Sequence, residues 1–184
     1  MKITLKDGSV REYDKSMSVY EIASDISEGL ARVAMAGEVN GEVVDLRTVV
    51  SEDCELNILT FQDEGGKDTF RHTSSHILAQ AVKRSIRRRS LLFGPAIADG
   101  FYYDVDRDIP FTTEDLEKIE KEMKKIVKEA LPVESFTLPR EEAIALMKEK
   151  EEPYKVELIE DLPEDAIISF YKQGEFTDCV RDRI

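Results

Sequence analysis

The sequence predicts an α+β fold in two domains. The first 60 residues combine hairpin signals with one amphipathic helix, and the remainder alternates helical periods with short apolar strands. Between them, residues 62–68 are polar and glycine-rich, which is typical of a linker. We therefore expect one domain at residues 1–61 and a second at residues 69–184, each long enough to bury a modest core.

The first domain shows a strand–helix–strand pattern. Strand signals lie at residues 2–6, 10–13, 33–39, 42–44 and 55–61. Asp7-Gly8 and Asn40-Gly41 favour the tight turns of two hairpins. Ser18, followed three residues later by Glu21, predicts a capping box at the start of a helix that runs to about Leu30. Two hairpins around one helix predict a β-grasp sheet.

The second domain begins with a long helical stretch and then mixes both kinds of element. Helices are expected at residues 69–88, from Thr112 or Thr113 to Ala130, and at 140–150, and strands at 100–105, around 136–138 and at 167–171. The helix that ends at Ala130 is highly charged, and its apolar positions repeat every 3.6 residues. That repeat predicts one buried face and one solvated face.

Composition excludes several classes of protein. Hydrophobic residues make up 41% and charged residues 35%, as in an ordinary globular protein. No apolar stretch approaches the roughly 18 residues of a membrane span, and two distant cysteines imply no disulfide framework, so we expect a cytoplasmic protein with no membrane partner. A net charge of −13 argues against coating nucleic acid through bulk electrostatics, although local contact with RNA stays open.

Both histidines of the chain lie in one motif, as His72 and His76. Positions i and i+4 share a helix face, so the two imidazoles can converge on one ligand, water or metal. The motif lacks the glutamate of a zincin, and Cys179 is the only further soft ligand, so we expect no metal site. Spacing alone slightly favours a pair of histidines with no shared task.

Five segments around this pair occur in the order of a known family. They are residues 70–79 (FRHTSSHILA), 94–95 (GP), 99–104 (DGFYYD), 152–155 (EPYK) and 169–171 (SFY). Together they resemble the editing domain of threonyl-tRNA synthetases, and the first domain resembles the TGS domain that precedes it there. The resemblance covers essentially the whole chain.

The resemblance implies hydrolysis of serine wrongly esterified to tRNA(Thr). A synthetic pocket rejects serine poorly, because one methyl group is worth only about 1–3 kcal/mol. The resemblance assigns His72, His76 and Cys179 to catalysis, with the histidines positioning or activating the attacking water. Tyr103, Lys155 and Asp178 are expected to bind substrate, and the partner is tRNA(Thr).

Two segments depart from the family pattern. Residues 178–184 (DCVRDRI) place the cysteine one position early and have Ile184 where the family has histidine, so the second domain is expected to be incomplete. Residues 85–93 (SIRRRSLLF) replace a segment resembling LYPEAKLAF; the three arginines would contact phosphate or form a solvated helix end. Back-translation with chosen codons suggests a third hypothesis, a single-base frame shift in each segment. It predicts a longer or frayed helix near residue 88.

The resemblance also implies a larger parent protein. That parent is a threonine–tRNA ligase using ATP, threonine and tRNA(Thr), homodimeric through domains outside these residues, with ATP and zinc bound only in its catalytic core. We expect no cofactor and no aminoacylation by this chain itself, and editing only if the second half of the site functions. Two alternatives are a non-enzymatic TGS-containing regulatory or RNA-binding module and a free-standing trans-editing deacylase.

Overall fold

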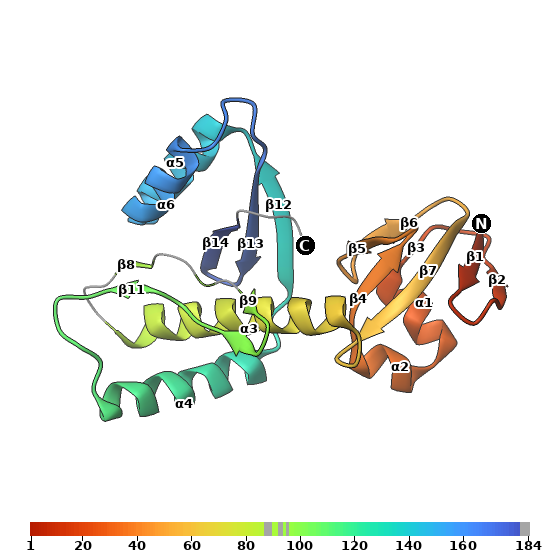
Figure 1. Ribbon diagram of the computed structural model, residues 1–184, viewed down its shortest axis with the longest axis horizontal. Helices are drawn as coiled ribbons and strands as arrows, with labels where there is room; N and C mark the ends of the chain where they lie inside the picture. The colour runs from red at the N-terminus through yellow and green to blue at the C-terminus, as the bar shows by residue number, and fades with distance from the viewer. Residues whose placement is uncertain (87–89, 92–93, 95, 181–184) are drawn as a thin grey trace. The chain divides into compact units, whose positions relative to one another are not determined.

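A computed structural model describes residues 1–86, 90, 91, 94 and 96–180 (Figure 1). The chain forms two units, residues 1–71 and the residues from His72 onward. Helices and strands occur in both units, which confirms the predicted α+β class.

The first unit is built on a five-stranded sheet with the order β2-β1-β7-β4-β5. Its strands are β1 (Lys2–Leu5), β2 (Val10–Glu12), β4 (Ala34–Val39), β5 (Glu42–Val44) and β7 (Cys54–Thr60). β1 and β7 are parallel, and the other pairs are antiparallel. Two short strands, β3 (Met17–Ser18) and β6 (Val49–Val50), pair beside it. This is the β-grasp arrangement that the sequence predicted.

The predicted helix of this unit is present but divided in two. Ser18 and Glu21 form the expected capping box at the start of α1 (Val19–Ile26), which confirms that prediction. A second helix, α2 (Glu28–Val33), follows after Ser27, whose backbone is extended. The Ser27 hydroxyl accepts hydrogen bonds from the backbone N–H groups of Gly29 and Leu30 and so starts a new helix instead of continuing the first.

The segment predicted as a linker is largely helical, because α3 spans Glu64–Ser85. A Cβ atom at Gly66 would lie 1.9 Å from the carbonyl oxygen of Thr60. Gly66 therefore allows the helix to approach the end of β7, a packing role that a flexible linker does not require. The extension of this helix predicted near residue 88 falls on residues 87–89, outside the described residues.

The second unit contains a three-stranded antiparallel sheet with the order β12-β13-β14. Its strands are β12 (Val133–Leu138), β13 (Ile168–Gln173) and β14 (Phe176–Val180). The helices are α4 (Thr113–Glu129), α5 (Arg140–Glu149) and α6 (Pro153–Glu160). Two short pairs complete the unit, β8 (Ser90–Leu91) with β11 (Val105–Asp106) and β9 (Ala96–Ile97) with β10 (Gly100–Phe101). α4 begins at a capping box on Thr112, which is one of the two caps that the sequence predicted.

Three features of this unit differ from expectation. α6 was not predicted, because eight residues starting at Pro153 are too few to show a clear helical period. β14 was not predicted either, since it follows a tight turn at Gly174 and carries polar residues. The single strand expected at residues 100–105 is two short strands, β10 and β11, that belong to different pairs.

Two hydrophobic clusters hold the second unit together. One contains residues of α3, α4, β8 and β14, among them Val82, Ile126 and Phe176. The other packs α5 and α6 on β13 and β14, with Met147 and Phe170 fully buried. In the described part of the chain, no helix is long and apolar enough to cross a membrane.

Candidate active site

Helix α3 places the two histidines side by side. The ring centroids of His72 and His76 lie 4.6 Å apart, as positions i and i+4 on one helix face allow. Both rings face Tyr171 of β13, at centroid distances of 6.1 and 5.8 Å. The predicted convergence of the two imidazoles is therefore present in the structure.

Asp178 of β14 connects these histidines to the other expected site residues. Its Oδ1 atom lies 2.8 Å from the Lys155 ammonium, and its Oδ2 atom accepts a 2.7 Å hydrogen bond from the Tyr103 hydroxyl. His76 Nδ1 is 3.1 Å from Oδ2, at ion-pair distance although not aligned for a straight hydrogen bond. Five of the six predicted site residues thus form one cluster, although they come from four separate segments of the chain.

The charges of this cluster are buried. Asp178 and Lys155 are each only 4% exposed. Burial opposes ionisation of Asp178, but the Lys155 ammonium and His76 outweigh it and hold the pKa of the carboxyl well below its ordinary value. Burial, reinforced by the Asp178 charge, raises the pKa of Tyr103 well above its ordinary value. Asp178 is thus a carboxylate and Tyr103 a neutral hydrogen-bond donor at neutral pH.

His72 is held neutral. Burial, together with the proximity of His76, lowers the pKa of His72 from 6.5 to about 4. The Nε2 atoms of both histidines are buried and have no hydrogen-bond partner among the described residues. Each therefore has one ring nitrogen whose hydrogen-bonding capacity is unused among the described residues.

Tyr103 is fixed by an unusually close neighbour. A Cβ atom at Gly94 would lie 2.0 Å from the Tyr103 ring, so only glycine fits beside the ring in this position. Gly94 is the first residue of the GP segment, and its contact gives that segment a physical role. Sequence reasoning used Gly94 for the resemblance but did not connect it to the site.

Cys179 lies apart from this cluster. Strand residues alternate between faces, so Cys179 points away from Asp178 and packs with Phe170, Met147 and Ile159. Burial raises the pKa of the Cys179 thiol to about 11. The structure therefore does not bring this predicted catalytic residue to the histidines. The expected position of the missing family histidine, Ile184, lies outside the described residues.

Glu152 was missed by the sequence analysis. It is buried at the start of α6, pairs with the Lys83 ammonium, and accepts a hydrogen bond from the backbone N–H of Leu91 at 3.4 Å. The Lys155 backbone N–H bonds to the Glu152 carbonyl, so this anchor fixes the turn that presents Lys155. Its place in the EPYK segment was the available signal.

No metal centre is evident in the described residues, since no three His, Cys, Asp or Glu side chains converge there in a ligating arrangement. The cluster instead pairs one carboxylate with one ammonium, which already neutralises its charge.

Comparison with known proteins supplies the family. Residues 1–60 match the family described as the TGS domain. The chain is 66% identical to a threonine–tRNA ligase of Acetivibrio thermocellus over 178 residues, and 59% identical to that of Clostridioides difficile over 181 residues. These alignments cover 97% and 98% of this chain. The chain belongs to the threonyl-tRNA synthetase family.

The chain corresponds to about the first 180 residues of those ligases. It spans 28% of the length of either curated relative. The TGS match at residues 1–60 agrees with the β-grasp fold predicted for the start of the chain, and the relatives agree with the resemblance seen in the sequence.

Proposed function

We propose that the second unit hydrolyses the ester between serine and tRNA(Thr). The observation that carries the proposal is the buried cluster in which His76 Nδ1 lies beside the Asp178–Lys155 ion pair, while the Nε2 atoms of His72 and His76 have no hydrogen-bond partner among the described residues. The sequence relationship supports the substrate, because a ligase for threonine must deal with serine. The range 69–184 as a hydrolytic domain belongs to the same proposal.

The hydrolytic step assigns different tasks to the two histidines. Water attacks the ester carbonyl, its proton passes to a histidine nitrogen, and the bond to the ribose oxygen breaks as that oxygen takes up a proton. His76 takes the role of the base in this scheme, because its Nδ1 lies 3.1 Å from the Asp178 carboxylate. His72, with its pKa at about 4, is a weak base and is better suited to orient the water.

The remaining cluster residues bind substrate in this proposal. Lys155 and Tyr103 are held by Asp178, so their positions do not depend on the substrate. A preorganised ammonium and hydroxyl can orient the aminoacyl group or the terminal adenosine without a further entropic cost. The catalytic role predicted for Cys179 would require its thiol to leave the core, and the scheme assigns it no step.

The test is single-turnover hydrolysis of seryl-tRNA(Thr) by the 184-residue chain, with threonyl-tRNA(Thr) as the competing substrate. We expect seryl ester loss above the spontaneous rate, and a fall on the order of 100-fold or more in His76→Ala. Asp165→Asn, at an exposed position, is the matched control and should keep the parental rate. A parental rate equal to the spontaneous one would refute the proposal.

A binding function without hydrolysis is the second candidate. It is favoured by the position of Cys179, since the resemblance expects that thiol at the site and the structure buries it in the core. Binding of seryl-tRNA(Thr) with no ester loss would support this alternative.

The activity of a longer protein is a separate part of the proposal. Threonine–tRNA ligation with ATP, a homodimer and a cytoplasmic location would belong to a protein of the relatives' full length. This chain corresponds to 28% of such a protein. Absence of aminoacylation by the 184-residue chain, combined with its presence in a full-length counterpart, is the expected result.

A further inference from the structure

Helix α3 carries a polar stripe that extends beyond the site. His72, His76, Gln80 and Arg84 follow one another at intervals of four residues and so share one helix face. The two histidines belong to the cluster described above. Gln80 and Arg84 continue the same face toward the turn between β13 and β14.

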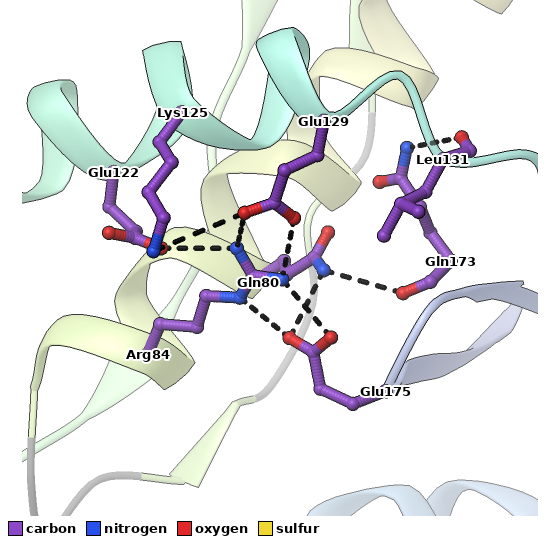
Figure 2. Close-up of polar contacts among 8 residues, drawn as sticks. All are labelled: Gln80, Arg84, Glu122, Lys125, Glu129, Leu131, Gln173 and Glu175. Carbon is purple, nitrogen blue, oxygen red and sulfur yellow. Dashed lines mark hydrogen bonds and ion pairs between the residues drawn. The ribbon is translucent and has the colours of Figure 1, made fainter.

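Arg84 binds that turn through Glu175 (Figure 2). Its Nε and Nη2 atoms donate to the two oxygens of Glu175 at 2.6 and 3.1 Å. Nη1 and Nη2 also donate to both oxygens of Glu129, each at 3.0 Å, and Nη1 donates to Glu122 at 3.1 Å. All the donor directions of the guanidinium are therefore used, with one fork on the hairpin and one on α4.

Gln80 contacts the same turn from within the protein. It is almost fully buried, and its Nε2 atom lies 3.3 Å from both the Gln173 carbonyl oxygen and Glu175 Oε1. Figure 2 shows Gln80 and Arg84 meeting Glu175 from adjacent turns of α3. The hairpin end is thus fixed by a neutral amide and a charged fork together.

The register of the hairpin links this anchor to the site. Gln173 pairs with Phe176 at the turn, and Tyr171 pairs with Asp178 one repeat further along. Asp178 lies only three residues after Glu175, which belongs to the turn that leads directly into β14. A shift of the turn along α3 would therefore carry the Asp178 carboxylate with it relative to His76.

We propose that Arg84, assisted by Gln80, is a positioning residue that sets Asp178 against His76. The geometric part stands on the contacts above, whereas its consequence for catalysis rests on the proposed hydrolysis. A carboxylate 3.1 Å from Nδ1 favours the proton on that nitrogen, because a lone pair there would face negative charge. The tautomer with Nδ1–H leaves the Nε2 lone pair available to water.

The first test reads the tautomer without any substrate. Only two histidines occur in the chain, so long-range ¹H–¹⁵N NMR of the rings can assign both. We expect Glu175→Gln to move the His76 ring nitrogens from an Nδ1–H pattern toward an average of both tautomers. Glu129→Gln is the matched control, since it removes an equal fork on the same guanidinium but from α4, and it should leave the pattern unchanged. Identical spectra for Glu175→Gln and the parental chain would overturn the proposal.

The second test separates positioning from simple stability. Arg84→Lys keeps the charge but loses the paired fork, and we expect a fall on the order of tenfold in the single-turnover rate with little change in apparent substrate affinity. Circular dichroism and the thermal midpoint verify that the variant is folded. A parental rate in a folded Arg84→Lys would contradict the catalytic part. If the parental chain itself does not hydrolyse the ester, the tautomer measurement still decides the geometric part.

Discussion

Two adjacent residues of β14 show opposite responses to burial. Asp178 meets His76 of α3 and Lys155 of α6, whereas Cys179 packs with apolar residues of α5, α6 and β13. Both are 4% exposed. Yet the pKa of Asp178 is held below its ordinary value, whereas the pKa of Cys179 rises to about 11.

The difference comes from the partners on each face. Asp178 has an ammonium, a hydroxyl and an imidazole within 3.1 Å, which outweigh the cost of removing its charge from water. Cys179 packs among apolar side chains, so burial has the largest effect on the pKa of its thiol, with smaller opposing effects of the Lys155 and Asp178 charges. One strand thereby supplies a charged face suited to chemistry and an apolar face suited to stability.

Removing the carboxylate is expected to have the largest effect on this contrast. Asp178→Ala removes the carboxylate that lies 2.8 Å from the buried Lys155 ammonium and that accepts the hydrogen bond of the Tyr103 hydroxyl. We expect the free energy of unfolding to fall by about 3–5 kcal/mol, measured by urea denaturation. Asp165→Ala, an exposed carboxylate on the same unit, should change it by less than about 0.5 kcal/mol. Equal losses in the two variants would show that the ion pair does not stabilise the unit.

A smaller loss in the free energy of unfolding is expected when Gly94, which packs against the Tyr103 ring, is replaced. In Gly94→Ala the new methyl group would meet the Tyr103 ring, so the ring must move away from Asp178. Overpacking of this kind costs about 1–3 kcal/mol. Gly100→Ala is the control, because a Cβ atom there meets nothing within 4 Å. A Gly94→Ala chain as stable as the Gly100→Ala chain would mean that Tyr103 yields without cost.

Lowering the pH should reduce the free energy of unfolding through the buried His72. The unfolded histidine takes up a proton near pH 6.5, whereas the folded one does so only near pH 4. Between these values the unfolded state binds more protons, so the free energy of unfolding falls as the pH falls. We expect a loss on the order of 1–3 kcal/mol across this window, absent in His72→Asn. A loss of the same size in His72→Asn would assign the effect to other groups.

The sequence predicted the first unit better than the second for a physical reason. Ser18, Glu21 and the Asn40-Gly41 turn act through neighbouring residues, so local chemistry sufficed to locate their elements. Ser27 was the exception, since its hydroxyl competes with the helix for backbone N–H groups. Gly66 was read as flexible because its close contact with Thr60 is invisible along the chain.

For the candidate site, too, some features could be predicted from the sequence and others could not. The four-residue spacing of His72 and His76 predicted their shared face, and the resemblance named Tyr103, Lys155 and Asp178. Neither could predict that Asp178 contacts His76, Lys155 and Tyr103 directly, since those contacts depend on the undetected strand β14. The same missing strand concealed the orientation of Cys179, because alternation has no meaning until a strand is assigned.

The smallest expected effect is that of replacing Cys179, and it tests whether the Cys179 face of β14 takes part in the chemistry of the Asp178 face. Cys179→Ala should lower the free energy of unfolding by about 1 kcal/mol, as a small apolar group leaves a packed cluster. Since the thiol points away from the histidines, we expect the single-turnover loss of seryl ester to keep its parental rate. Cys54→Ala, in the first unit, controls for loss of a thiol as such. A rate that collapses in Cys179→Ala alone would show that the thiol reaches the reacting atoms, and the apolar face of β14 would then also contribute to the chemistry.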